Sequence, residues 1–183
     1  YKLMVVDAWM LKDGKLQRAW RWDGDEENPI VRSMGAHSMV TADVDGDGRD
    51  EILLGSCMLD DNGTLLWSSG LGHSDKAYLC KLHPDMQVFM VSEPKKEDGR
   101  GVSVVDAATG KLIWKIGQTT YHVGDGMVAD FDSSHPGMEC FASEDRKGGS
   151  TDKYLFTADG KKINTTNAEV PGCRNWIWWD ADL

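Results

Sequence analysis

Ala108-Thr109-Gly110-Lys111-Leu112-Ile113-Trp114 is a glycine turn that leads into a short apolar run ending in tryptophan. A glycine turn before apolar residues also occurs at Gly14, Gly63 and Gly160, and the turn at Gly63 is again followed by a tryptophan, Trp67. The turns therefore repeat at a period of about 50 residues, which is typical of an array built from one supersecondary unit.

Each unit contains short apolar runs bounded by Gly, Asp, Asn or Pro, which is the pattern of strands and turns. The clearest runs are residues 52–54, 88–91, 102–105, 112–114 and 154–156. The pairs Asp13-Gly14 and Asn62-Gly63 favour hairpins, because both central residues of a type I′ turn need positive φ. No window shows a sustained helical period, so we predict essentially no helix.

An all-β repeat of this length, with a tryptophan in the hairpin, predicts the four-stranded blade of a β-propeller. The chain has 183 residues and therefore holds about four blades. The first residues already have the pattern of a strand, and the last ones stop inside a motif that occurs earlier. We therefore predict that residues 1–183 form a single partial β-propeller domain, an arc of a larger ring rather than a tight four-bladed one.

Composition excludes two classes of partner. Acidic residues outnumber basic ones by 30 to 20, giving a net charge of −10, which disfavours nucleic-acid binding. No apolar run approaches the ~20 residues that cross a bilayer, so we expect no membrane span.

The cysteines do not predict a zinc site, because no pair has CxxC spacing. Both buried free thiols and a single disulfide remain open. They are Cys57, Cys80, Cys140 and Cys173.

The acidic loop at residues 43–51 is the sharpest local signal. Its carboxylates stand at alternate positions and its glycines let the loop fold back, as in oxygen-rich calcium sites. The twelfth position of an EF-hand loop would be Leu54, so the bidentate glutamate of that motif is missing. A solvated turn is the alternative, but clustered carboxylates repel one another without a cation. The predicted ligands are the side chains of Asp43, Asp45, Asp47 and Glu51 and the carbonyl of Arg49.

A weaker version of this loop predicts a second calcium site at Asp130, Asp132 and Glu139, with a solvated turn as the open alternative. Asp180 and Asp182 repeat the Asp-x-Asp marker a third time. In the unit around residues 79–84 the corresponding position of the repeat has no carboxylates.

Three histidines, His37, His73 and His122, lie in glycine-flanked segments. Equivalent positions of successive blades meet around the central channel of a propeller, so we expect these side chains to converge. Asp75 lies two residues after His73 and so points the same way along a strand, and Glu93 follows an apolar run at a blade end. Singly, each is more often a structural group, but together they predict a mixed histidine–carboxylate cation pocket.

In combination, several segments resemble the rhamnogalacturonan lyases of polysaccharide lyase family 11. They are residues 37–38, 43–48, 70–75, 106–114, 129–132 and 177–183. The resemblance implies an eight-bladed propeller with many bound Ca²⁺ ions, of which this chain is roughly the middle half. It also implies that His37, His73, Asp75 and Glu93 hold a calcium in the active-site cleft.

The implied reaction is β-elimination at galacturonate in rhamnogalacturonan, an acidic plant polysaccharide. Calcium would neutralise the carboxylate beside the C5 proton, and a basic side chain would remove that proton. Bound cations would also let an acidic protein hold a polyuronate.

The resemblance further implies a secreted, cell-surface or periplasmic protein, which we expect to be monomeric at full length.

One position departs from the family pattern. The family's catalytic arginine precedes a Gly-Met pair, whereas this chain has Asp125 before Gly126-Met127, and the catalytic lysine lies beyond Leu183. No catalytic residue is therefore assigned. A calcium-stabilised carbohydrate-binding or adhesion propeller without turnover is the first alternative. A quinone-dependent dehydrogenase is the second, because residues 106–114 also resemble the tryptophan-docking repeat of those propellers.

Overall fold

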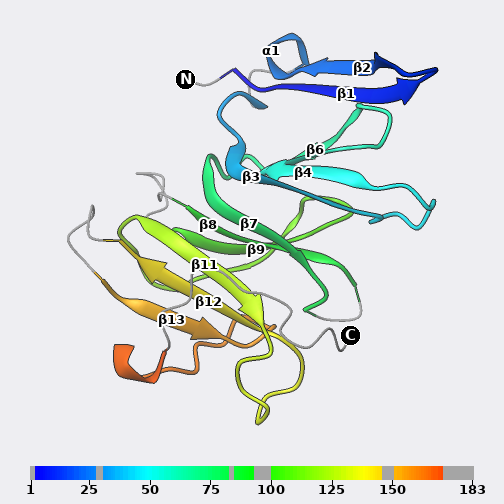
Figure 1. The fold of residues 1–183 in the computed structure, drawn as a ribbon. Coiled ribbons are helices and arrows are strands. Elements are labelled where there is room, and N and C mark those ends of the chain that lie inside the picture. The colour runs from blue at the N-terminus through cyan, green and yellow to red at the C-terminus, as the bar shows by residue number, and fades with distance from the viewer. Residues whose placement is uncertain (1–2, 28–30, 83–84, 93–99, 146–150, 171–183) are drawn as a thin grey trace.

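The computed structural model describes residues 3–27, 31–82, 85–92, 100–145 and 151–170. These residues form four antiparallel sheets that follow one another along the chain, as Figure 1 shows. The first sheet pairs β1 (Val5–Lys12) with β2 (Lys15–Asp23). The second contains β3 (Gly35–Ala42), β4 (Glu51–Gly55), β5 (Cys57–Leu59) and β6 (Leu65–Ser68). The third contains β7 (Ser74–Cys80), β8 (Gln87–Ser92), β9 (Val102–Asp106) and β10 (Leu112–Lys115). The fourth contains β11 (Val123–Ala129), β12 (Glu139–Glu144) and β13 (Lys153–Phe156).

The all-β prediction is confirmed, and every apolar run named above lies in a strand. The helices named among the described residues are short: the single turn α1 (Gly24–Glu27) and a 3-10 turn, Asn167–Glu169. None of these described helices is long and apolar enough to span a membrane. The sheets do not close into a ring within the part of the chain that the structure describes.

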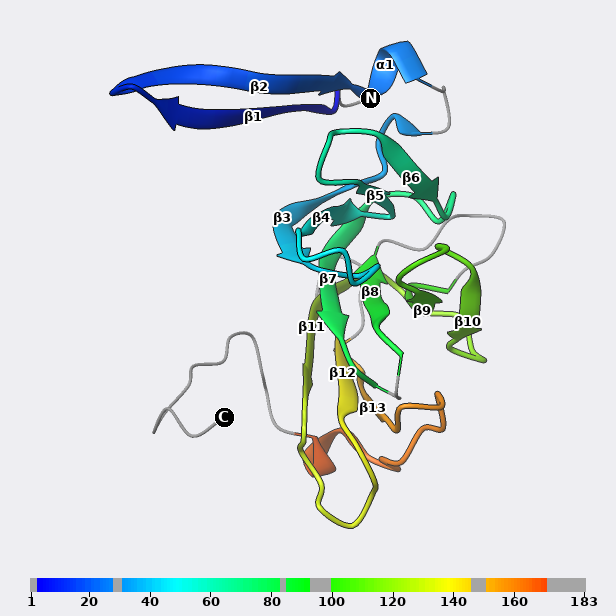
Figure 2. The ribbon, with the colours of Figure 1, turned by 90° about the vertical axis from the view of Figure 1, so that its right-hand side faces the viewer.

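Each sheet is a simple meander, and the first strands of three sheets lie against one another. β3 contacts β7, and β7 contacts β11. Figure 2 shows these three strands along one line, with the other strands of each sheet extending to the same side. Side chains near corresponding ends of β3, β7 and β11 can therefore meet, although they come from distant parts of the sequence.

The hydrophobic core lies between successive sheets, not inside any one of them. In β8, Val88 and Met90 pack toward the second sheet, whereas Phe89 and Val91 pack toward the fourth. Successive side chains of a strand point to opposite faces, so a strand covered on both faces has a continuous apolar sequence. This explains why apolar runs, not alternating patterns, marked the strands.

A tryptophan from each of the first three sheets docks on the glycine turn of the next sheet. The indole of Trp67 donates to the Ala107 carbonyl at 2.8 Å. Its ring covers Gly110, where a Cβ atom would lie 2.5 Å from the ring. Equivalent contacts join Trp20 to Asp61 and Gly63, and Trp114 to Ala158 and Gly160. The repeat found in the sequence therefore marks the contacts that join neighbouring sheets. We call each pairing of a tryptophan with the turn glycine of the next sheet a tryptophan lock.

Both predicted hairpins are present, because β1 pairs with β2 and β5 pairs with β6 in antiparallel fashion, but only the first has a type I′ turn. Asp13 and Gly14 both have positive φ, at 52° and 73°, as a type I′ turn requires. At the Asn62-Gly63 pair only the glycine has positive φ, at 85°. Here Gly63 N donates to Asp60 O at 2.9 Å, a longer turn closed by one left-handed residue.

Three cysteines, Cys57, Cys80 and Cys140, are free thiols. Burial raises the pKa of Cys57 and of Cys80 to about 12, so these thiols stay protonated and unreactive at neutral pH. Cys173 lies outside the described residues, as do Glu93, Asp180 and Asp182.

Candidate metal centres

Irregularities in the strand pairing place the candidate ligands near one end of β3 and β7. The register between β7 and β8 shifts across residues 74–76, at Asp75, and that between β3 and β4 shifts across residues 35–40, which include His37. β11 has a shift across residues 123–125. A bulge bends its strand and redirects side chains, so it can turn them toward a neighbouring strand.

The structure gathers His37, His73 and Asp75 into one cluster. Each offers a ligand atom, and these atoms all lie within 4.8 Å of one another. The Nε2 atoms of the two histidines are 3.3 Å apart, and His37 Nε2 lies 3.6 Å from a carboxylate oxygen of Asp75. Two sheets contribute to this group, because His37 lies on β3 whereas His73 and Asp75 lie at the start of β7.

The backbone fixes the orientation of one of these rings. His73 Nδ1 lies 2.5 Å from the carbonyl oxygen of Gly35, which can only accept a hydrogen bond. The ring proton therefore sits on Nδ1, and the lone pair of Nε2 faces His37. The two rings meet edge to face at 87°. A metal-binding histidine is usually held by a hydrogen bond from its other ring nitrogen, as His73 is here. The cluster therefore fits a divalent cation.

Sequence reasoning grouped His122 with the other histidines without counting it among the ligands, and it missed Asp145. His122 Nε2 lies 3.0 Å from Asp75 Oδ2, and its Nδ1 lies 2.8 Å from an oxygen of Asp145. Asp145 follows strand β12 as Glu93 follows β8. The argument that selected Glu93, an acidic residue directly after an apolar run, would also have selected Asp145. Glu93, the fourth predicted ligand, lies outside the described residues.

The loop between β3 and β4 brings together Asp43, Asp45 and Glu51, whose ligand atoms also lie within 4.8 Å of one another. Glu51 is fully buried, and its Oε2 accepts from Val44 N at 2.6 Å and from Asp45 N at 3.3 Å. Its Oε1 has no hydrogen-bond partner. Burial raises the pKa of Glu51, opposed by these two hydrogen bonds. An unpaired buried oxygen beside two other carboxylates fits a hard cation.

The remaining residues of this loop hold its shape. Asp47 is outside the cluster, and its carboxylate accepts from Arg49 N at 2.9 Å. The Arg49 guanidinium pairs with Asp61 at 2.8 Å. Gly46 and Gly48 have φ of 81° and 88°, which turn the chain back over the carboxylates. Ligation by Asp47 and by the Arg49 carbonyl stays a prediction.

The second acidic loop shares only part of this arrangement. Glu139 is fully buried, its Oε2 accepts from Phe131 N and Asp132 N at 2.7 and 2.9 Å, and its Oε1 has no partner. The Asp132 carboxylate instead accepts hydrogen bonds from Ser134, which lower its pKa. Asp130 is exposed. The structure does not gather Asp130, Asp132 and Glu139, so calcium binding there stays a prediction.

The intervening unit shows what the loop looks like without these acids. Gln87 pairs with β7 at the register position that Glu51 and Glu139 occupy against β3 and β11. Lys81 follows β7 where Asp43 follows β3. The third sheet therefore lacks counterparts of Asp43 and Glu51.

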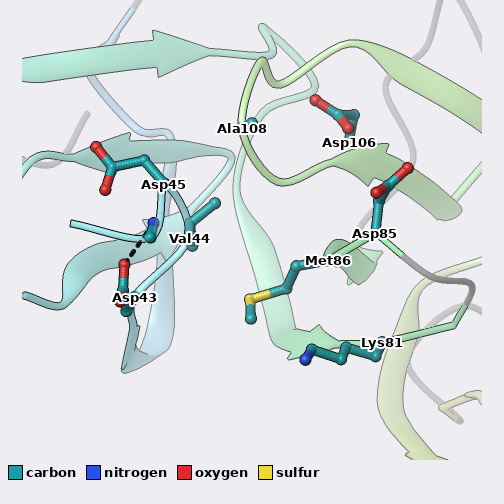
Figure 3. Close-up of a pocket in the computed structure, with 9 residues that line it drawn as sticks. Asp43, Val44, Asp45, Lys81, Asp85, Met86, Asp106 and Ala108 are labelled. Carbon is teal, nitrogen blue, oxygen red and sulfur yellow. Dashed lines mark hydrogen bonds between the residues drawn. The ribbon is translucent and has the colours of Figure 1, made fainter. Parts of the chain in front are cut away.

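A pocket of about 390 Å³ separates the first acidic loop from the third sheet (Figure 3). Asp43 and Asp45 line one side, and Lys81, Asp85 and Asp106 line the other. This pocket adjoins the end of β3, whereas the histidine cluster adjoins its beginning. The two candidate centres thus lie at opposite ends of the strands.

The comparisons with known proteins agree with this architecture. The family model described as rhamnogalacturonan lyase family 11, C-terminal domain, matches residues 1–183. Rhamnogalacturonan endolyase YesW of Bacillus subtilis (strain 168) is 41% identical over 187 residues, covering 100% of this chain and 28% of that protein. Rhamnogalacturonan exolyase YesX of the same organism is 36% identical over 188 residues, covering 100% of this chain and 30% of that protein.

A solved structure, the Bacillus licheniformis rhamnogalacturonan lyase PL11, superposes with a TM-score of 0.83 at 38% identity. The match covers 100% of this chain and 30% of that one. The chain thus spans less than a third of the relatives that it matches. Since the family model matches its whole length, the chain belongs to rhamnogalacturonan lyase family 11.

Proposed function

We propose that this chain supplies the cation-binding part of the substrate cleft in a calcium-dependent lyase that cleaves rhamnogalacturonan by β-elimination. The observation that carries the proposal is the meeting of His37, His73 and Asp75 from two different sheets. Two imidazole nitrogens 3.3 Å apart with a carboxylate oxygen beside them form a set of ligand atoms that suits a divalent cation. A divalent cation bound there would be shared by all three side chains, and family membership makes Ca²⁺ the expected ion.

We further propose that the sheets are successive blades of an eight-bladed propeller. The tryptophan locks and the alignment of β3, β7 and β11 support this arrangement. In such a ring the histidine cluster would lie at one mouth of the central channel. Export from the cell follows as a proposal from a polymeric plant substrate.

The side chains of the cluster have separate tasks in this reaction. His37, His73 and Asp75 would hold the ion, which when bound neutralises the galacturonate carboxylate and so makes the neighbouring C5 proton easier to remove. The Gly35 carbonyl keeps the lone pair of His73 Nε2 directed into the cluster. A chain with a net charge of −10 would otherwise repel a polyuronate, so the charge of the bound ions is needed for substrate binding as well.

A binding module without turnover is the second candidate, and Asp125 favours it. Asp125 lies on β11, and the adjoining Gly126 carbonyl accepts a hydrogen bond from Tyr78 at 2.7 Å. Burial raises the pKa of Tyr78, and the negative charge of Asp125 adds to this shift. A carboxylate cannot replace a catalytic arginine, because it repels the developing charge that an arginine would stabilise. The dehydrogenase alternative is set aside, because the whole chain matches the model of rhamnogalacturonan lyase family 11.

Mixing full-length protein with rhamnogalacturonan and Ca²⁺ separates these candidates. A lyase produces an unsaturated uronate, whose conjugated double bond absorbs in the ultraviolet. The proposal predicts a steady rise in absorbance that EDTA abolishes and added Ca²⁺ restores. Polysaccharide retained in a pull-down without any rise would establish the binding module instead.

Glu51→Gln should remove most of the stabilisation that calcium gives to the first loop. The substitution keeps the shape of the side chain and reproduces the amide found at Gln87. A ligand at 100-fold its dissociation constant stabilises by about 2.7 kcal/mol, and we expect most of this increment to be lost. In EDTA the variant should be at least as stable as the parent, since one of three clustered charges is gone. Thermal unfolding with and without Ca²⁺ measures both effects.

Asp50→Asn is the matched control. Asp50 lies beside Glu51 but is exposed, outside the cluster, and hydrogen-bonded to Thr41 at 3.0 Å. It should keep the full calcium response. If Glu51→Gln behaves like Asp50→Asn, the loop is a solvated turn and not a calcium site.

A further inference from the structure

We propose that His122 is a positioning residue that aims Asp75 at the cation cluster, and that Asp145 and Gly124 hold His122 in place for this task. The inference rests on the proposed function, because it assigns Asp75 the role of a ligand. It adds a third sheet to the site, since His122 directly precedes β11.

The two oxygens of Asp75 face different partners. Oδ1 lies 3.6 Å from His37 Nε2, within the cluster, whereas Oδ2 lies 3.0 Å from His122 Nε2. The side chains of Asp75 and His122 are only 13% and 15% exposed. A carboxylate held by one oxygen in a poorly hydrated place cannot rotate freely, so the other oxygen stays directed at the cation position.

His122 is itself held from the other side. Its Nδ1 lies 2.8 Å from Asp145 Oδ2, and the two backbones are joined by a hydrogen bond from Asp145 N to His122 O at 2.9 Å. Both side-chain contacts are short, and neither has the angles of a hydrogen bond. Asp75, His122 and Asp145 therefore form a row of close polar contacts that runs from the cluster to the end of β12.

Gly124 leaves the space that this chain needs. A Cβ atom at this position would lie 3.2 Å from Asp145 Oδ2 and 3.4 Å from His122 Cε1. Its backbone is not left-handed, so alanine is compatible with the local conformation. Gly124→Ala would thus crowd the histidine–aspartate contact without straining the chain, and it tests the geometry without removing any charged group.

Calorimetric titration of the full-length protein with Ca²⁺ tests the proposal. His37→Ala identifies the cluster, because it removes one binding event from the wild-type profile. His122→Ala should weaken the same event by roughly 10–100-fold, the usual cost of losing an outer partner of a metal ligand. His122→Gln, whose amide can place an N–H near the position of Nε2, should recover most of that affinity. Gly124→Ala and Asp145→Asn should weaken the same event. Asp13→Asn, in the exposed turn between β1 and β2, is the control for a lost surface carboxylate.

The possible results separate the two proposals. A purely structural role for His122 would lower the melting temperature of both His122 variants without any recovery of affinity by glutamine. Wild-type affinity in His122→Ala at the His37-sensitive event would overturn the inference alone. Absence of any His37-sensitive event in the wild type would overturn the cation cluster of the proposed function, and this inference with it.

Discussion

Replacing Trp67 with alanine should lower the free energy of unfolding by about 3–5 kcal/mol, the usual cost of truncating a buried aromatic side chain. Trp67 is only 7% exposed and packs between the second and third sheets. The substitution also removes the donor to the Ala107 carbonyl and uncovers Gly110. Urea unfolding of the full-length protein, followed by circular dichroism, measures the loss.

Leu66→Ala is the matched control for this prediction. Leu66 neighbours Trp67 on β6 but is 43% exposed, so its truncation should cost well under 1 kcal/mol, as is usual for surface changes of this size. A loss as large as that of Trp67→Ala would mean that the strand, and not the docked indole, controls stability.

Gly110 provides a second test of the same lock. It has a φ of 67° and no space for a Cβ atom under the Trp67 ring, so Gly110→Ala should destabilise the protein on its own. In the double variant the collision with the ring disappears, so the combined loss should be smaller than the sum of the single losses. Strictly additive losses would show that the ring and the turn act independently.

The fold could be predicted to the extent that its signals are local. Turn glycines and apolar runs depend on a few adjacent residues, and each unit repeats them. Trp20 was missed because it follows its turn glycine, Gly14, by six residues, whereas Trp67 and Trp114 follow theirs by four. The type of the turn at Gly63 was also missed, because turn length depends on how the paired strands end.

The candidate sites also differ in how close together their residues lie in the sequence, and this decides how well each could be predicted. Asp43, Asp45 and Glu51 lie within nine residues, so their spacing alone predicted a shared cation. His37 and His73 meet only because the repeat aligns β3 with β7, and the repeat made that meeting predictable. The histidine repeat also predicted that His122 would lie near this cluster, but not that it would face Asp75 on one side and Asp145 on the other. Those pairings depend on where the register of each strand pair shifts, which a short sequence pattern does not report.

His73→Ala should reduce lyase activity by about 10²–10³-fold, the loss expected when one preorganised electrostatic group of an active site is removed. His73 is the most firmly oriented member of the cluster, because its Nδ1 is bound to the Gly35 carbonyl. Initial rates of unsaturated product formation at saturating Ca²⁺ measure the loss. In EDTA the melting temperature should stay close to that of the parent, because no bound cation then contributes to stability.

Imidazole added to the His73→Ala variant distinguishes a lost ligand from a disturbed fold. The truncation leaves a space the size of the ring beside His37, with the Gly35 carbonyl still present to accept from an N–H group. A free imidazole that binds there restores a nitrogen facing the cation, so activity should rise with imidazole and saturate. The parent protein should show no such rise. If His73→Ala retains the parent's rate, the cation that activates the substrate is held elsewhere, and the pairing of His37 with His73 has only a structural role.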